Sequence, residues 1–343
     1  MMHYLNTLFV TTQGAYLSKE GEAVSVQVER ETRLRVPLHG LGGIVCFGQV
    51  SCSPALMGEC GERHLAISFL TENGRFLAKV QGFTPGNVLL RREQYRRADD
   101  KAASLSLARA FVAAKIANSR TSLQRAVRDG LEPPGKESVE AAVRRLNFSL
   151  QKLENEQSLD GLRGMEGDAA RTYFEVFDHL IVAQKEDFSF QGRSRRPPMD
   201  NVNALLSFLY TLLLHDARAA CESAGLDSAV GFLHADRSGR PSLALDLMEE
   251  FRPFLADRLV LSLINRRQVA GRGFRHTEAG GVLMDDDTRK EVLVSYQKRK
   301  QEEITHPFLQ EKCAAGLLVH LQARLLARHL RGDQDGYPPF IWK

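Results

Sequence analysis

The chain has 343 residues and a formal net charge of +4; 43% of the residues are hydrophobic and 26% are charged, a composition that excludes a disordered chain and suits about two domains of ~150 residues. Its longest apolar run, residues 204–214, is well short of the roughly 20 residues of a membrane span, and no basic segment followed by an apolar one opens the chain, so neither a transmembrane nor an exported protein is expected. The five cysteines are odd in number and lack CxxC spacing, which favours a reduced cytoplasm and argues against a zinc site.

Residues 1–95 alternate between apolar and polar side chains, a period that predicts β-strands. Valines alternate with polar residues over 24–28, and the runs HLAISFL and RFLAKV lie on either side of Asn73-Gly74, which is typical of a hairpin turn. We therefore expect a small, mostly antiparallel β domain. The charged run RREQYRRADD follows it, and we assign a linker to residues 96–103.

From residue 104 to residue 343 the apolar period becomes helical. Apolar residues recur every three or four positions over 105–116 and over 139–153, with the breaker GLEPPG between them. Asp200 can cap a long helix, and a further helix is expected after Pro253. The predicted fold class is α+β, a small antiparallel β domain followed by a larger all-α catalytic domain.

Basic residues gather at three places in the second half of the chain: Arg193, Arg195 and Arg196; Arg266, Arg267, Arg272 and Arg275; and Lys298, Arg299 and Lys300. Such clusters bind a phosphate backbone favourably, because each phosphate charge that they neutralise releases counterions. Each cluster could equally be a solvated helix end. Three clusters in one half favour nucleic acid modestly.

The stretch HADRSGRPSLALDLMEEFRP predicts a short helix after a turn. Ser242 can cap a helix that runs to Arg252, and Pro253 marks its expected end. Asp246 and Glu249 are three residues apart on this helix, so both carboxylates lie on one face.

Two further residues could join these carboxylates. His234 lies just before the turn and could fold back towards the start of the helix. Glu166 shares a helix face with Ala170 and Tyr173, and a helix that begins near Glu166 would keep this carboxylate ionised. One histidine with two or three carboxylates suits Mg²⁺ or Mn²⁺. The alternative is an ordinary solvent-facing acidic surface with a packed histidine, and the spacing leaves both open.

The motifs GMEGDAAR (164–171), RSRRPPMDNVNALLSFLYTLL (193–213) and GFLHADRSGRPSLALDLMEEFRP (231–253) resemble those of the CRISPR-associated integrase family, the first-numbered Cas protein of spacer acquisition. The order of a β part and a helical part also matches, so the resemblance covers nearly the whole chain. The terminal YPPFIWK is similar to the type I-C branch.

The resemblance implies a site that binds Mg²⁺ or Mn²⁺ through Glu166, His234 and Glu249, with Asp246 assisting. Many relatives have aspartate at the position of Glu249; the longer glutamate arm still ligates through oxygen and changes only the metal preference and the exact geometry. Glu250, its neighbour, is expected to point to solvent or to a basic partner.

Other positions carry over as DNA-contacting residues. Arg195 and Arg196 would hold phosphates, or would pair with nearby acids. Tyr210 matches a tyrosine near the family's active site, or is a core residue. Arg240 and Arg252 bracket the acidic helix, where they would bind DNA or orient the carboxylates.

The resemblance implies a metal-dependent DNA integrase or endonuclease that inserts short foreign DNA into a CRISPR array by attack of a 3′-hydroxyl on a phosphodiester. One alternative is a nuclease that cleaves branched or single-stranded DNA without joining it. Another is a DNA-binding scaffold without activity. The implied partners are the prespacer and repeat DNA, a second copy of the chain, the second-numbered Cas protein and, for the type I-C branch, the fourth-numbered Cas nuclease, in a prokaryotic cytoplasm.

Overall fold

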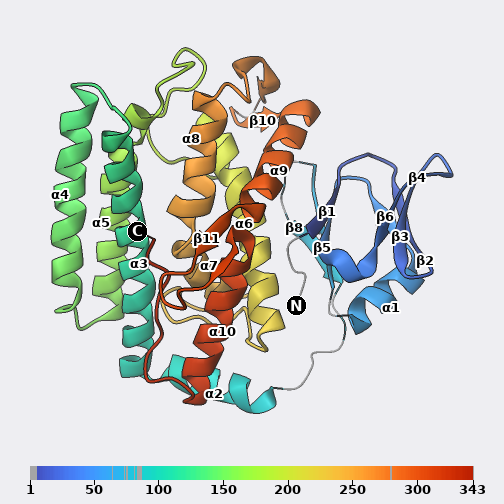
Figure 1. Cartoon of the computed structure of the whole chain (residues 1–343), viewed down its shortest axis with the longest axis horizontal. Helices are drawn as coiled ribbons and strands as arrows, with labels where there is room; N and C mark the ends of the chain where they lie inside the picture. Colours follow the sequence, from blue (N-terminus) through green and yellow to red (C-terminus); the bar gives the residue numbers. More distant parts are fainter. Residues whose placement is uncertain are drawn as a thin grey trace. The chain divides into compact units, whose positions relative to one another are not determined.

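The structure, a computed structural model, describes residues 6–342 except 64, 73, 75, 81, 83–86 and 279. The chain divides into two compact units (Figure 1). The first unit takes residues 1–86, 292–303 and 314–317, and the second takes 87–291, 304–313 and 318–343. Within the described ranges, no helix combines the length and the apolar composition that a membrane span requires.

The first unit is built on two mixed sheets, with the strand orders β1-β5-β7-β8 and β4-β3-β2-β6. The elements are β1 (Asn6–Val10), β2 (Tyr16–Glu20), β3 (Ala23–Val28), β4 (Glu31–Pro37), β5 (Leu41–Phe47), β6 (Ser51–Cys52), α1 (Pro54–Glu62), β7 (Ala66–Leu70) and β8 (Phe76–Val80). Their inward side chains form one hydrophobic core, which includes Leu17, Val24, Val26, Ile44, Leu56 and Ile67. The alternating valines over 24–28 are therefore confirmed as a strand, although Ser25 between Val24 and Val26 is also buried.

The prediction of an antiparallel domain is only partly right. β2–β3, β3–β4 and β7–β8 are antiparallel, but β1–β5, β5–β7 and β2–β6 are parallel. Parallel neighbours need a crossover connection, and helix α1 lies in the segment that joins β5 to β7. Asn73 of the predicted hairpin turn lies outside the described residues.

The second unit is mainly helical. Its helices are α2 (Val88–Asp99), α3 (Lys101–Arg128), α4 (Gly135–Leu153), α5 (Leu159–Glu175), α6 (Asn201–Ser223), α7 (Ser242–Glu249), α8 (Arg258–Asn265) and α10 (Leu318–Arg331), while α9 (Asp286–Gln301) crosses the division between the units. Helix α3 packs against α4 and α5, and α6 packs against α7 and α10. The predicted helices over 105–116 and 139–153 are confirmed, and the Asp200 carboxylate caps α6 by accepting from the Asn203 amide.

The sequence predicted a purely helical second part, and this prediction is wrong. The described residues also form the two-stranded pairs β9 (Phe274–His276) with β10 (Val282–Met284) and β11 (Glu303–Thr305) with β12 (Lys312–Ala314).

The predicted linker over residues 96–103 is helical apart from Asp100, and the division between the units falls at residues 86/87 instead of near 95. The charged run that suggested a connector is helix α2, because Glu93 pairs with Arg97 one turn on (3.0 Å) and Gln94 is buried against the carbonyl oxygens of Asp227 and Val230. Asp100 then caps α3.

Three predictions about helix ends are also wrong. Helix α5 begins at Leu159, capped by Ser158, so Glu166 lies in the middle of the helix and not at its positive end. Ser242 does not cap α7, because its hydroxyl donates to the Ala235 carbonyl. Pro253 does not end the helical segment: it sits in the first turn of a π-helical stretch, Arg252–Asp257, where a missing N–H costs little, and the chain continues into α8.

Candidate active site

The two acids that α7 carries three residues apart face the protein interior. Asp246 is fully buried and Glu249 is 2% exposed. A solvated acidic surface is therefore excluded for this pair, and buried carboxylates require hydrogen bonds or cations nearby.

Asp246 is occupied in holding the segment before the helix. Its carboxylate accepts from the backbone amides of Phe232 (2.6 Å), Leu233 (3.0 Å) and His234 (2.9 Å), and its Oδ1 also lies 2.6 Å from Nδ1 of the His234 ring. The carboxylate fixes the ring through Nδ1 and leaves Nε2 available, an arrangement typical of metal-ligating histidines. The predicted return of His234 towards the helix is confirmed.

Glu166 and Glu249 meet across a lysine that the motif analysis did not identify. Lys115 of α3 forms ion pairs with Glu166 Oε1 and, at 2.6 Å, with Glu249 Oε2. The second oxygen of Glu249 lies 3.1 Å from Arg252 Nη2 and 3.9 Å from His234 Nε2. The structure thus brings together Glu166, His234, Asp246 and Glu249, as the sequence predicted.

Positive charge dominates the electrostatics of Glu249. Burial by itself raises the pKa of a carboxyl group, but Arg252, Lys115 and His234 outweigh it and lower the pKa of Glu249 to about 2. The group is therefore ionised at neutral pH.

The donor atoms of Glu166, Glu249 and His234 are of the kind that a hard divalent cation binds, but in this structure an ammonium group occupies the space between the two glutamates. In the described part of the chain, no group of three or more His, Cys, Asp or Glu side chains is arranged to hold a metal ion, and the ammonium of Lys115 lies between the two glutamates. The space between Glu166 and Glu249 therefore already holds a positive charge. In addition, the buried Glu249 Oε2 accepts no hydrogen bond of standard geometry, and carboxylate oxygens with an imidazole nitrogen suit Mg²⁺ or Mn²⁺.

Glu250 does not point to solvent, contrary to the prediction. It is fully buried and accepts from the Tyr337 hydroxyl (2.5 Å), the Phe340 amide (2.7 Å) and the Gln322 amide group (3.1 Å). Burial raises the pKa of Glu250 to about 8. The residue anchors the C-terminal segment and is turned away from the Glu166, Glu249 and His234 group by its place one residue further around the helix.

Tyr210 lies between two arginines. Its hydroxyl donates to Asp257 (2.6 Å), and the guanidinium groups of Arg193 and Arg252 lie 5.1 and 4.8 Å from its ring centre. Burial raises the pKa of Tyr210 well above its usual range. Arg252, whose side chain is 15% exposed, orients Glu249 and Tyr210, which is the second of its two predicted roles.

The other predicted DNA-contacting arginines are accessible. Arg195 and Arg196 are exposed and form no ion pair with any described residue. Arg240 lines a cavity of about 490 Å³ together with Arg218 and Arg237. A neighbouring cavity of about 310 Å³ is lined by His234 and Arg163 and shares Val230 and Asp236 with the first.

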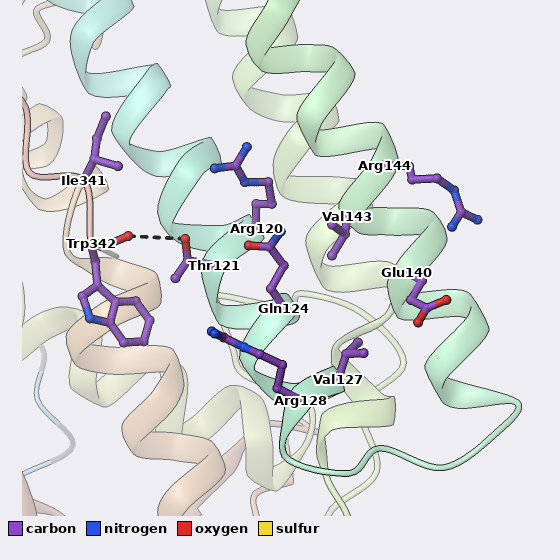
Figure 2. Close-up of a pocket in the computed structure, with 10 residues that line it drawn as sticks. All are labelled: Arg120, Thr121, Gln124, Val127, Arg128, Glu140, Val143, Arg144, Ile341 and Trp342. Atoms are coloured by element: carbon purple, nitrogen blue, oxygen red, sulfur yellow. Dashed lines mark hydrogen bonds between the residues drawn. The ribbon is translucent and has the colours of Figure 1, made fainter.

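A larger cavity, of about 710 Å³, lies away from these residues (Figure 2). It is bounded by α3, α4 and the C-terminal segment, where the Thr121 hydroxyl donates to the Trp342 carbonyl (3.3 Å). Its lining includes Arg120, Arg128 and Arg144 but none of the acids or the histidine predicted for the site. Size alone therefore does not identify the reactive centre of this molecule.

Two residues of the site were missed by the sequence reasoning. Lys115 interrupts the apolar run FVAAKIA, and a lysine inside such a run is a signal of a buried, paired ammonium. Asp257 follows Pro253 in a stretch that was expected only to begin a new helix, and nothing in its spacing indicated the contact with Tyr210.

Comparison with known proteins gives a consistent result. A family model described as CRISPR associated protein Cas1 matches residues 8–298. The CRISPR-associated endonuclease Cas1 1 of Chlorobaculum tepidum is 57% identical over 343 residues, and Cas1 2 of Rhodospirillum rubrum is 51% identical over 347 residues; each match covers 100% of both chains. A CRISPR-associated exonuclease Cas4/endonuclease Cas1 fusion of Geobacter sulfurreducens is 35% identical, over 97% of this chain and 60% of the fusion.

Solved structures share the fold at lower identity. A casposase bound to integration product matches with a TM-score of 0.83 and 22% identity, over 98% of this chain and 94% of the casposase. A chain of a Cas6-RT-Cas1–Cas2 complex matches with a TM-score of 0.82 and 23% identity, over 98% of this chain and 36% of that chain. These likenesses confirm the order of a β part and a helical part. With a family model that spans most of the sequence and full-length relatives above half identity, the chain belongs to the Cas1 family.

Proposed function

We propose that this chain is a divalent-metal-dependent DNA integrase and endonuclease that inserts short foreign DNA into a CRISPR array. The names of its full-length relatives support an endonuclease, and the product in the casposase structure supports joining chemistry. The observation that carries the proposal is the meeting of Glu166, Glu249 and His234 beside a buried positive charge.

In this proposal Glu166, Glu249 and Nε2 of His234 hold Mg²⁺ or Mn²⁺. The bound ion would stabilise negative charge on the phosphoryl group. Asp246 keeps the His234 ring in place through Nδ1, and Arg252 keeps the Glu249 carboxylate in place. Both are positioning residues.

The reaction is a transesterification. The 3′-oxygen of the short DNA attacks phosphorus and loses its proton, while the bond from phosphorus to the 3′-oxygen of the cut strand breaks and that oxygen gains a proton. Arg195, Arg196 and Arg240 would hold phosphates by charge. Tyr210 is not required as a nucleophile, because its hydroxyl is held by Asp257 between two arginines.

A nuclease that uses water as the nucleophile is the second candidate, because the same residues would serve hydrolysis. A scaffold without activity is not supported, since binding alone does not require two carboxylates and a histidine to be gathered in the interior.

The partners follow from the same proposal. The chain would act in the cytoplasm as a homodimer on prespacer and repeat DNA. The structural neighbour that contains Cas1–Cas2 supports a Cas2 partner, and the Cas4/Cas1 fusions support a Cas4 partner. The terminal YPPFIWK motif supports the type I-C branch.

The test uses two short duplexes that differ only at their 3′ ends, one with a 3′-hydroxyl and one with a 3′-deoxy end. Each is incubated with a repeat-bearing plasmid, the protein and Mn²⁺. We expect joined product only with the 3′-hydroxyl duplex. Plasmid cleavage without joining for both duplexes would support the nuclease, and no change in the plasmid under any condition would contradict both enzymatic proposals.

A further inference from the structure

Lys115 is buried in the middle of α3. The residue is 8% exposed, and its neighbours Ala114, Ile116 and Ala117 lie in the core. Removing an ammonium group from water is costly unless anionic partners replace the lost hydration. A lysine at this position therefore needs those partners for the helix to pack.

Its partners are the two carboxylates proposed to bind metal. Nζ contacts Glu166 from α5 and Glu249 from α7, so a single ammonium joins three helices. Glu249 keeps a second cation in Arg252 at 3.1 Å, whereas Glu166 has Lys115 alone among its described ion pairs. Without Lys115, the partly exposed Glu166 carboxylate (26%) and the buried Glu249 carboxylate (2%) would lie close together with no cation between them.

We propose that Lys115 is a positioning residue whose ammonium holds Glu166 and Glu249 together before a divalent cation binds, and that the cation displaces it from between them. The two positive charges cannot share the same carboxylate oxygens, because like charges repel strongly at such distances. Lys115 and the divalent cation thus compete for one position. This inference rests on the proposed function in taking Glu166 and Glu249 as metal ligands.

Competition has two consequences that a merely structural lysine would not produce together. Loss of the ammonium should destabilise the protein in chelator, because it removes the described ion pair of Glu166 and leaves the buried Glu249 with Arg252 as its remaining close cation. The same loss should strengthen metal binding, because the ion no longer has to displace a resident charge.

The test compares wild-type protein with Lys115→Met, which keeps the length of the apolar stem. Mn²⁺ binding is measured by calorimetry without DNA at one fixed pH, and thermal unfolding is followed in chelator and in Mn²⁺. We expect Lys115→Met to bind Mn²⁺ at least about tenfold more tightly, and its melting temperature in chelator to fall by about 5 °C or more. Mn²⁺ should recover most of that loss.

Two further variants make the result specific. Lys101→Met removes an exposed lysine from the first turn of the same helix and should change neither quantity. Lys115→Met combined with Glu166→Gln removes the repulsion along with the lysine, so the pair should be less destabilising in chelator than the sum of the two single changes. If Lys115→Met fails to fold in chelator but the double variant folds, that recovery itself shows that the charge of Glu166 destabilises the protein once the ammonium is gone.

The outcomes separate this inference from the proposed function. If wild-type protein binds Mn²⁺ and Lys115→Met binds it no more tightly, the competition is contradicted while the metal site stands. If neither wild-type protein nor Lys115→Met binds Mn²⁺, the metal-dependent function itself is contradicted. Unchanged stability of Lys115→Met in chelator would also overturn the proposed holding role.

Discussion

Glu249 and Glu250 are adjacent buried carboxyl groups whose pKa values lie on opposite sides of the usual range, at about 2 and about 8. Burial raises both, but Glu249 also faces Arg252, Lys115 and His234, while Glu250 has neutral partners from the C-terminal segment. Sequence spacing identified both acids and could not tell which faced a cation. Arg252 lies three residues after Glu249 in the sequence, but Lys115 lies far away in the chain and meets Glu249 only through the packing of α3 against α7.

Asp257 provides a prediction at the same scale. Burial raises its pKa to about 6, above its ordinary value of 3.8. The native state therefore holds the proton more tightly than the unfolded chain, and the contribution of Asp257 to stability is present below pH 4 and is lost as the pH rises to 6. The free energy of unfolding of Asp257→Asn should lack this pH-dependent contribution, because asparagine does not titrate.

The measurement is urea unfolding of both proteins between pH 4 and pH 7. The stability of wild type relative to Asp257→Asn should fall by at most about 1.4 kcal/mol per pH unit up to pH 6 and then level off. A difference that stays constant over this range would contradict the assignment.

At the scale of elements, regular helices were predictable and their ends were not. The three- and four-residue apolar periods of α3 and α4 appear directly in the sequence, as does the cap at Asp200. The start of α5 is marked by a local cap at Ser158 that the sequence analysis overlooked, whereas the cap and the end of α7 depended on the surroundings of that helix. Ser242 donates to a loop carbonyl instead of capping, and a π-helical turn absorbs Pro253. The prediction that Asp246 and Glu249 share one helix face is unaffected by these errors, because spacing within a helix does not depend on where the helix begins.

The loop before α6 carries the clearest prediction for DNA. Arg195→Ala with Arg196→Ala should weaken binding of unrelated DNA sequences about equally, because phosphate contacts carry no base information. The dependence of binding on salt should fall by about two charges. Binding isotherms at several salt concentrations give both quantities.

Lys136→Ala with Arg144→Ala removes the same charge from exposed positions of α4 and serves as the control. An equal loss of salt dependence in the control, or a loss confined to one DNA sequence, would contradict a phosphate-binding role for the loop.

At the scale of the whole molecule, the sequence revealed the change from strand period to helix period but not the discontinuous division. Residues 292–303 belong to the first unit, where the Gln297 side chain donates to the Thr7 carbonyl (3.1 Å). The apolar pattern of α9 predicts a helix but does not indicate that the division between the units falls within it. Parallel pairing in the sheets was likewise hidden, since alternation is the same in both orientations.

We predict that the β unit mediates assembly with a second copy. Strand β4 is an edge strand of seven residues, mostly exposed, and its Leu34 is 47% exposed. An exposed edge of this kind is a template for pairing between chains. Leu34→Lys in the full chain should therefore shift the protein from dimer to monomer in sedimentation.

Leu77→Lys makes the same change on β8, the edge of the other sheet, where Leu77 is 52% exposed. This variant should remain dimeric. Dimers of Leu34→Lys at micromolar concentration, or monomers of Leu77→Lys, would show that β4 does not form the contact.

The central claim is that Glu166, His234 and Glu249 form the reactive centre. The most direct measurement compares the Glu249→Gln and Glu250→Gln variants in the joining of a 3′-hydroxyl duplex to a repeat-bearing plasmid. Glutamine removes the charge of Glu249, whereas at neutral pH it resembles the protonated form of Glu250. Glu249→Gln should lose joining on the order of 100-fold or more with its fold intact, as should Glu166→Ala and His234→Ala, while Glu250→Gln should remain active. Joining by Glu249→Gln at the wild-type rate in the presence of Mn²⁺ would contradict the account.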